Sequence, residues 1–265
     1  MNFIYSRTSS DGEESTLPFT AHPWLRGDGI FETIKTEFGQ PFFLNRHLAR
    51  ALGASTFLRF TPFNMAALRD HINILLARTP LERGRLRITI FSDGEYLITH
   101  EESPLRVHPH KMLVSQYKKY SHSMLSGIKS LSYGESAQGM RLAAQKGCDD
   151  LLYFNEKNEV VEFGLANILI ERDGKFFTPT LESGALAGVV RGILLEWFSS
   201  ISEAVLTRED LKAADGVYVI SSLREIVLVS ELHWQNGDID KYRISADAEK
   251  LRTQYLINSR SNPNS

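Results

Sequence analysis

The sequence predicts an α+β fold of two domains, a smaller N-terminal α/β domain over residues 1–120 and a larger mixed domain over residues 121–265. Three observations support this prediction. Short apolar runs are joined by turn pairs such as Asp93-Gly94 and Asp173-Gly174, which favour hairpins. Helical patterns do not alternate regularly with these runs, as they would in a doubly wound parallel sheet. The stretch 117–126 is polar and rich in serine, as expected of a connection between two halves of a chain.

Each element expected in the first half rests on a local pattern. A strand is predicted over residues 30–38, and a turn leads from it to a second apolar run at residues 42–44. Helical spacing follows over residues 44–58. Thr61 and the proline after it are interpreted as the cap and first turn of a second helix, ending near residue 77. Further strands are expected at residues 86–91, 96–98 and 111–117.

In the second half of the sequence, we predict shorter strands and four helices. A helix over residues 136–146 is expected to end at Gly147, and residues 189–198 have the spacing of an amphipathic helix. Thr207 opens a capping box, and Ser245 is expected to cap the last helix. The expected strands are residues 151–154, 160–162, 166–170, 175–177, 217–221 and 226–232.

The composition argues against several classes of function. Lys and Arg total 30 against 32 for Asp and Glu, so no electrostatic attraction to nucleic acid or anionic membrane is expected. Neither a signal peptide nor an apolar stretch long enough to span a bilayer is evident, so we expect a cytoplasmic protein. The single Cys148 cannot form an intramolecular disulfide. It precedes two acids that disfavour a thiolate, which indicates a structural role.

Several motifs resemble known sites without matching them. No glycine-rich dinucleotide loop or phosphate-binding P-loop is present. Residues 134–139 imitate a hydrolase nucleophile elbow, but the second glycine lies one residue too far along the chain. The richest metal-like cluster comprises His100, Glu101, Glu102, His108 and His110. Its spacing is not that of known zinc sites, so we predict a polar loop between strands and no metal.

Three segments of the sequence indicate a function only when they are considered together with Lys129, which is described in the next paragraph. Residues 26–35 read Arg-Gly-Asp-Gly-Ile-Phe-Glu-Thr-Ile-Lys, and residues 47–50 read His-Leu-Ala-Arg. Taken singly, the first is a turn before a strand and the second is one turn of an amphipathic helix. Residues 186–191 place a glycine at a helix start, with Ser221 and Ser222 downstream. Free amides at such a start are suited to binding phosphate.

The fourth segment centres on Lys129, which lies between Ile128 and Leu131 in a strand-like stretch. Burial there would lower the pKa of the lysine and leave a neutral amine able to attack an aldehyde. Glu162 and Asn167 follow in two short strands. A neutral amine at Lys129 indicates covalent chemistry on a carbonyl.

In order and spacing, the four segments resemble the class IV aminotransferases, the fold-type IV pyridoxal-phosphate enzymes, over residues 25–229. This family includes branched-chain and D-amino acid aminotransferases and 4-amino-4-deoxychorismate lyase. The resemblance implies a barrel-like sheet in the C-terminal domain and pyridoxal 5'-phosphate as cofactor. It also implies amino acid and keto acid substrates and a homodimer.

The resemblance further implies roles for individual residues. Lys129 matches the lysine that holds the cofactor as a Schiff base and moves the α-proton. Glu162 matches the carboxylate that keeps the pyridine nitrogen protonated, so that the ring accepts electrons. Arg50 matches the arginine that binds the cofactor phosphate, and Asn167 a residue near the cofactor. The other implied cofactor-binding positions are Gly188, Val189, Val190, Ser221 and Ser222.

The reaction within the family stays open at the level of sequence. Phe31-Glu32-Thr33 differs from the Phe-Glu-Gly of branched-chain enzymes, and residues 92–96 lack the Arg-x-His of D-amino acid aminotransferases. Thr33 lies where 4-amino-4-deoxychorismate lyases have a threonine. We predict an aminotransferase, with that lyase as the alternative and a member that has lost catalysis as a distant third. The candidate substrate-binding residues are Phe31, Thr33, Lys35, Arg87, Tyr133 and Arg224.

Overall fold

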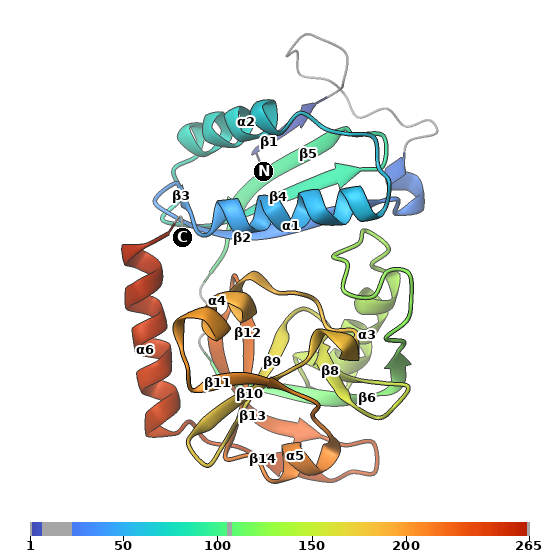
Figure 1. Ribbon diagram of the computed structural model, residues 1–265, viewed down its shortest axis with the longest axis vertical. Helices are drawn as coiled ribbons and strands as arrows, with labels where there is room; N and C mark the ends of the chain where they lie inside the picture. Colours follow the sequence, from blue (N-terminus) through green and yellow to red (C-terminus); the bar gives the residue numbers. More distant parts are fainter. Residues whose placement is uncertain (1, 7–22, 105–107, 264–265) are drawn as a thin grey trace. The chain divides into compact units, whose positions relative to one another are not determined.

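The computed structural model describes residues 2–6, 23–104 and 108–263, and the chain forms two compact units. The first unit comprises Met1–Leu105, Ile128–Tyr133 and Ser261–Ser265, and the second comprises Arg106–Gly127 and Gly134–Arg260 (Figure 1). This division differs from the expected one at residues 120 and 121. The chain enters the second unit earlier because the strand that begins at His110 pairs with strands of that unit.

The first unit is a five-stranded sheet in the order β1-β5-β4-β2-β3, with every neighbouring pair antiparallel. Two helices pack against it through one continuous apolar core that includes Ile34, Leu48, Ile72 and Ile88. The elements are β1 (Asn2–Ser6), η1 (Pro23–Arg26), β2 (Gly29–Glu37), β3 (Gln40–Pro41), α1 (Leu44–Phe57), α2 (Met65–Arg78), β4 (Arg83–Phe91) and β5 (Tyr96–Glu102).

Alternation along β2 gives this sheet two chemically different faces. Ile30 and Ile34 point into the core shared with the helices, and Glu32 lies on the same face between them. Phe31, Thr33 and Lys35 therefore lie on the opposite face. The first sheet thus presents one face to its helices and a second face that carries several predicted substrate residues.

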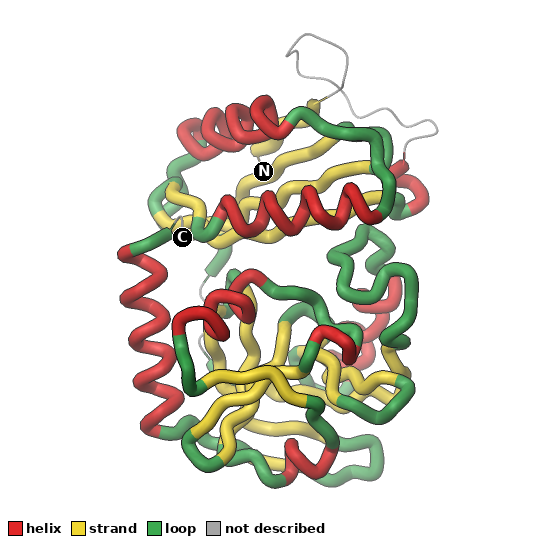
Figure 2. Tube along the Cα trace, in the orientation of Figure 1, coloured by secondary structure: helices red, strands yellow, loops and turns green. Residues whose placement is uncertain are grey.

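The second unit is built on a sheet in the order β11-β10-β9-β12-β13-β6-β7-β8, with β14 paired to β13. A short connection joins β8, at one end of this order, to β9 near the other end, so the sheet curls on itself (Figure 2). The barrel-like sheet expected from the family resemblance is thereby confirmed as a curled half-barrel. The strands are β6 (His110–Lys119), β7 (Asp150–Asn155), β8 (Val160–Phe163), β9 (Asn167–Arg172), β10 (Lys175–Pro179), β11 (Ile201–Ala204), β12 (Gly216–Ser221), β13 (Glu225–His233) and β14 (Ile239–Lys241).

The helices of the second unit cap and connect these strands. Two expected caps are confirmed: the Ser245 hydroxyl accepts the Ala248 amide at 2.9 Å, and Asp210 accepts the Thr207 amide at 2.8 Å. Gly147 ends α3 with a φ of +70°, which favours glycine. The helices are α3 (Gly134–Gln145), η2 (Leu181–Ser183), α4 (Val189–Trp197), α5 (Arg208–Lys212) and α6 (Ala246–Ser261).

The apolar run at residues 42–44 leads directly into α1, because Phe43 adopts a φ of 56° and the helix begins at the next residue. One local expectation in the first unit is wrong. Helix α2 begins at Met65, because the Asn64 side chain caps it by accepting the Ala67 amide at 3.1 Å. Thr61 and the proline after it lie before this cap.

The expected structural role of Cys148 agrees with its surroundings. The thiol is buried, and burial together with the charge of Asp149 raises its pKa. Within the described ranges, no helix has the length and apolar character needed to cross a bilayer.

Candidate active site

The predicted site residues fall into two groups, one in each unit. In the first unit, Lys129 lies in a short segment that runs against the start of β2. The Phe31 amide donates to the Lys129 carbonyl at 2.9 Å, and the Leu131 amide donates to the Gly29 carbonyl at 2.8 Å. A Cβ at Gly29 would lie 2.7 Å from the Ile90 carbonyl oxygen, so this close approach favours glycine. The expected strand-like stretch around Lys129 is thus a single antiparallel bridge.

Three other predicted site residues lie around the Phe31 ring. The Lys129 ammonium lies 4.4 Å from the ring centroid, and the Arg87 guanidinium carbon lies 3.8 Å from it. The Tyr133 ring meets it edge-on at 5.5 Å between centroids. Thr33 pairs directly with Arg87 across β2 and β4. The structure therefore brings together an amine, a guanidinium, a phenol and a hydroxyl on one side of the first sheet.

Lys35 has a different environment, although it follows the same alternation along β2. Its side chain is buried, and its ammonium donates to a Glu37 carboxylate oxygen at 3.2 Å. The same ammonium lies 3.6 Å from the centroid of the Phe42 ring. Lys35 is thus already engaged with an acid and an aromatic ring.

On the helix-facing side of β2, Glu32 forms a buried cluster with two residues of α1. Its carboxylate accepts the Arg50 Nε at 2.8 Å and Nη2 at 2.5 Å, and it lies 2.7 Å from the His47 Nδ1. Burial alone would raise the pKa of Glu32, but the charge of Arg50 and the hydrogen bonds from both partners hold it at about 2. Burial lowers the pKa of His47, so its ring is neutral and donates to the carboxylate.

Sequence reasoning selected Arg50 but did not assign roles to Glu32 or His47. A signal was present, since an acid lies between two core positions of a strand and would need a cationic partner. His47 and Arg50 are three residues apart and so share one side of α1. The cluster fixes the orientation of the arginine that the family resemblance assigns to phosphate.

In the second unit, Glu162 of β8 is a largely buried carboxylate that accepts three hydrogen bonds. One oxygen accepts the Lys119 ammonium at 2.8 Å. The other accepts the Asn167 side-chain amide at 3.2 Å and the Leu186 backbone amide at 3.1 Å. These three donors hold the carboxylate in place. Lys119 was not among the predicted residues.

Asn167 links Glu162 to the loop before α4. Its amide nitrogen also donates to the Leu186 carbonyl at 2.9 Å. A Cβ added at Gly188 would lie 1.9 Å from the Asn167 side-chain oxygen, so only glycine permits this packing. Asn167 also pairs with Ile220 near the end of β12. These contacts bring the carboxylate, the loop and the end of β12 into one region.

Helix α4 begins immediately after Gly188, which supplies no side-chain cap. The amides of Val189 and Val190 lack acceptors within the helix, and the helix dipole adds a partial positive charge there. This arrangement is suited to an anion such as phosphate. Ser221 ends β12, where its hydroxyl accepts the Arg224 amide at 3.2 Å, and Ser222 follows in the turn to β13.

The Arg224 side chain extends toward an acid at the start of β7. One terminal nitrogen lies 3.7 Å from an oxygen of Asp150, and it has no hydrogen-bond partner among the described residues. Burial raises the pKa of Asp150, whose carboxylate accepts the Leu151 and Leu165 amides. Arg224 therefore contacts this acid, and the structure gives it no contact with the Glu162 group.

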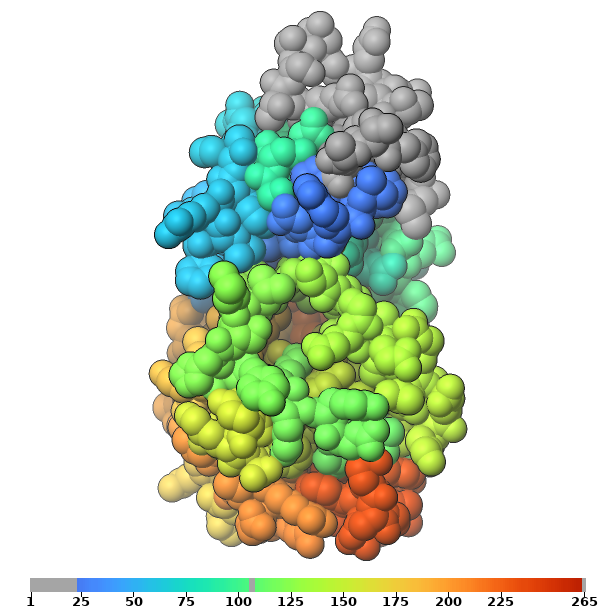
Figure 3. Space-filling view, turned by 90° about the vertical axis from the view of Figure 1, so that its right-hand side faces the viewer, coloured from blue at the N-terminus to red at the C-terminus, as the bar shows by residue number. Residues whose placement is uncertain are grey.

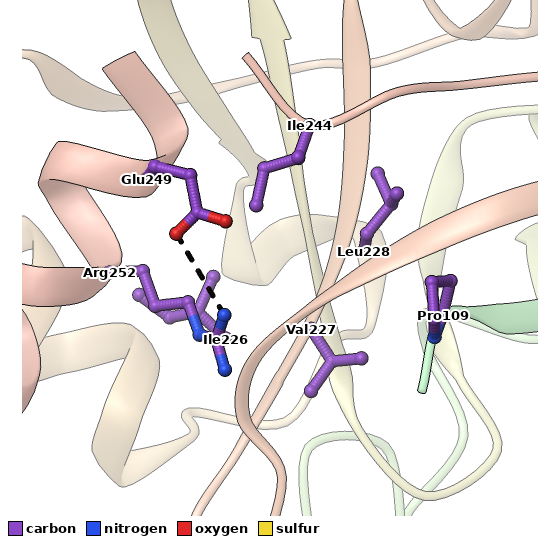
Figure 4. Close-up of a pocket in the computed structure, with 7 residues that line it drawn as sticks. All are labelled: Pro109, Ile226, Val227, Leu228, Ile244, Glu249 and Arg252. Atoms are coloured by element: carbon purple, nitrogen blue, oxygen red, sulfur yellow. Dashed lines mark ion pairs between the residues drawn. The ribbon is translucent and has the colours of Figure 1, made fainter. Parts of the chain in front are cut away.

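A cavity of about 140 Å³ in the second unit lies apart from these residues (Figure 4). An ion pair between Glu249 and Arg252, 3.8 Å long, lies at its side. No predicted site residue lines it. Its lining consists of Pro109, Ile226, Val227, Leu228, Ile244, Glu249 and Arg252.

The metal-like histidine cluster considered from the sequence is divided between the units. His100 belongs to the first unit, where its two ring nitrogens each lie 2.8 Å from a threonine hydroxyl, of Thr36 and of Thr79. His108 and His110 belong to the second unit. The predicted cluster is therefore not assembled within either unit.

Comparison with known proteins identifies the family. The profile described as Amino-transferase class IV matches residues 29–232, and the chain belongs to this family. Aminodeoxychorismate lyase of Vibrio harveyi is 28% identical over 86% of this chain and 91% of its own length. D-alanine aminotransferase of Listeria monocytogenes is 20% identical over 88% of each chain. Branched-chain aminotransferase of Thermoproteus uzoniensis has the same fold, with a TM-score of 0.84, 22% identity, and coverage of 97% of this chain and 93% of its own.

The family is pyridoxal-phosphate dependent, and the chain's residues fit that cofactor. A phosphate needs donors without protein acceptors, and the uncapped start of α4 offers them. A protonated pyridine nitrogen needs a carboxylate, and Glu162 lies in the same region through Asn167. One difference is that Lys119 already donates to the Glu162 oxygen that does not contact Asn167. Both oxygens of this carboxylate therefore already accept donors from the chain.

Proposed function

We propose that this enzyme is a pyridoxal-phosphate-dependent aminotransferase that transfers an amino group between an amino acid and a 2-keto acid. The observation that carries the proposal is the group formed by Glu162, Asn167 and Gly188 at the start of α4. It offers a fixed carboxylate and a set of free amides, the two partners that opposite ends of this cofactor require.

The chain's own residues would divide the chemistry as follows. The bound cofactor supplies an aldehyde and a ring that accepts electrons. Lys129 would hold the cofactor through its amine and would serve as the general base for the Cα proton of the substrate. Glu162 keeps the ring nitrogen protonated. Arg50, oriented by Glu32, contributes positive charge to the phosphate.

The remaining phosphate donors and the substrate contacts are also part of the proposal. The amides of Val189 and Val190 and the hydroxyl of Ser222 would bind the phosphate oxygens. Arg87 offers a guanidinium for a substrate carboxylate, and it already stacks on the Phe31 ring at 3.8 Å. Ser221, Thr33 and Tyr133 supply hydroxyl groups. Lys35 and Arg224 are weaker candidates, because each contacts an acid in the structure.

The decisive test of the proposal is the identity of the modified lysine. The protein is incubated with pyridoxal phosphate, reduced with borohydride, digested and analysed by mass spectrometry. We expect the pyridoxyl group on the Lys129 peptide, and neither label nor turnover in Lys129→Ala. Lys146→Ala, which removes an exposed lysine, is the matched control and should be labelled like the wild type. Label on a different lysine would overturn the assignment.

A second candidate function is 4-amino-4-deoxychorismate lysis, which expels pyruvate from the substrate and gives 4-aminobenzoate. The similar protein from Vibrio harveyi, an aminodeoxychorismate lyase that is 28% identical, favours it. Thr33, directly opposite Arg87 across the strands, agrees with the threonine that the family resemblance assigns to such lyases. A panel of D- and L-amino acids with several keto acids, run beside aminodeoxychorismate with pyruvate detection, separates the two. Pyruvate release without any amino transfer would replace our proposal with the lyase.

We propose further that the enzyme acts as a cytoplasmic homodimer, as the family resemblance implies. Three exposed apolar side chains support a contact with a second copy of the chain. The exposed fractions of Tyr117, Tyr120 and Met124 are 57%, 68% and 85%. Segments between β6 and β7, drawn in green, make up much of the face of the second unit that Figure 3 presents. The mass of the single chain is 30.0 kDa. Light scattering coupled to size-exclusion chromatography should give twice that mass. A mass equal to the single chain would refute the dimer.

A further inference from the structure

A second group of chemically active side chains lies in the second unit, away from the residues assigned above. His108, His110 and Asp149 each direct one ligand-type atom toward the others, and these three atoms lie within 4.8 Å of one another. The His110 Nδ1 lies 3.4 Å from one Asp149 oxygen, and the His108 Nε2 lies 3.9 Å from the other. Ligand atoms around a tetrahedral zinc ion, with bonds of about 2.1 Å, lie about 3.4 Å apart. The separation between His110 and Asp149 matches that spacing, and the one between His108 and Asp149 is about half an ångström longer.

The fold explains why these side chains meet. Strands β6 and β7 are parallel neighbours, so their first residues lie at the same edge of the sheet. His110 begins β6, and Asp149 immediately precedes β7. The two backbones are joined there, because the Asp149 amide donates to the Lys111 carbonyl at 2.7 Å. His108 lies two residues before His110, a spacing that favours the same side of an extended chain.

The strongest sign of a ligand is the buried imidazole of His110. Its exposed fraction is 0%. Among the residues that the structure describes, Nδ1 has the long 3.4 Å contact with Asp149, and Nε2 has no hydrogen-bond partner. A buried polar group without a partner is costly unless something outside the chain satisfies it. The Asp149 carboxylate is also fixed in place, since one of its oxygens accepts the Lys111 amide at 2.9 Å. Ligands of bound metals are commonly oriented by such a second hydrogen bond.

We propose that His108, His110 and Asp149 bind a divalent transition-metal ion of the zinc type, with water at the remaining coordination position. Two imidazoles and one carboxylate form a ligand set that suits zinc and its neighbours and does not suit Mg²⁺, which prefers oxygen ligands alone. The exposed fractions of the His108 and Asp149 side chains are 62% and 34%, so an ion reaches the site from solvent. The ion would tie the start of β6 to the start of β7.

Neighbouring charges permit a cation at this position. Arg224 lies close enough to His110 to act on it electrostatically and would oppose a metal ion. That guanidinium is balanced by Asp150, 3.7 Å away, and Lys111 is balanced by Glu231 at 3.1 Å. The Asp149 carboxylate therefore remains as the negative charge available to an ion. Because the site uses none of the residues assigned to the cofactor, it does not depend on the proposed function.

Titration calorimetry with ZnCl₂ tests the proposal. The full chain is prepared without a histidine tag, stripped with a chelator and titrated with pyridoxal phosphate absent. We expect one equivalent of Zn²⁺ to bind, a matching rise in Tm, and no response to MgCl₂. Replacing Zn²⁺ by Co²⁺ should give visible ligand-field bands, which report coordination independently of enzyme activity.

The variants are chosen so that folding is not in doubt. His108→Ala and Asp149→Asn change partly exposed side chains, and each should weaken Zn²⁺ binding by at least roughly tenfold, the low end of the loss seen for outer-shell partners alone. His122→Ala removes another exposed histidine of the same unit and should bind like the wild type. The proposal is overturned if the wild type binds no stoichiometric Zn²⁺. Equal affinity in His108→Ala, or an equal loss in His122→Ala, would overturn it too.

Discussion

The packing of Gly188 against Asn167 allows a sharp test, because Gly192, a glycine within α4, serves as a control. The Gly188 backbone, with φ −65° and ψ 140°, is accessible to alanine, so strain in the main chain is not expected. The added Cβ would nevertheless lie 1.9 Å from the Asn167 side-chain oxygen. Gly192, one turn later, has open space where its Cβ would be. Gly188→Ala and Gly192→Ala should therefore change stability in opposite directions.

The magnitude follows from the contacts that must move. Asn167 can yield only by lengthening its hydrogen bonds to Glu162 and Leu186, at about 1 kcal/mol each. Overpacking adds roughly 1–3 kcal/mol, so Gly188→Ala should lose about 3–5 kcal/mol in total. That loss corresponds to a fall in Tm on the order of 10 °C. Gly192→Ala should gain up to about 1 kcal/mol, since alanine favours the helix interior.

Calorimetry of the cofactor-free variants measures the stability, and absorbance titration with pyridoxal phosphate measures affinity. Gly188→Ala should bind the cofactor roughly tenfold more weakly or worse, because its effect reaches both Glu162 and the start of α4. Gly192→Ala should bind it like the wild type. If Gly188→Ala melts together with the wild type and binds with equal affinity, the packing of Asn167 does not organise this region. A matching loss in both variants would point to a general effect on the helix.

Two further predictions concern buried charges. The pKa of Glu32 is lowered from 4.5 to about 2, so its stabilising contribution is present above pH 4.5 and is lost as the pH falls toward 2. Glu32→Gln should therefore remove part of the acid sensitivity and cost roughly 3–5 kcal/mol at neutral pH, measured by urea unfolding across pH; an unchanged acid profile would contradict the assigned pKa. Tyr218→Phe removes a hydroxyl that donates to Glu171 at 2.8 Å and should cost about 1–3 kcal/mol in the same assay. Its kcat should equal that of the wild type, and a slower kcat would show that the site extends along β12 beyond its end at Ser221 to Tyr218.

The sequence predicted most elements because their signals are local. Alternation gave β4, a continuous apolar run gave β12, and glycine and serine signals gave the end of α3 and the start of α6. The error in the first unit came from two competing cap signals. At Thr61, a good cap was present, but Asn64 is an equally good cap and lies closer to the core positions of α2.

The assembly of the site depended on contacts between residues distant in sequence. Lys119 reaches Glu162 across 43 positions, through the pairing of β6 with β7 and of β7 with β8. No pattern within a window of ten or twenty residues contains that information. By contrast, Glu162 and Asn167 are five positions apart, and the short connection between β8 and β9 suffices to bring them together. The family resemblance supplied what the local patterns did not.

Glu32 and Glu162 follow one physical rule in two different units. Each is a carboxylate that apolar strands remove from water, which is unfavourable without compensation. Each is compensated by a cation and by neutral donors: Arg50 and His47 for Glu32, and Lys119 with two amides for Glu162. Apolar residues of similar volume would stabilise such positions at least as well. A buried charge that adds no stability indicates a role in catalysis or binding. Both of these carboxylates contact residues that we assign to the cofactor.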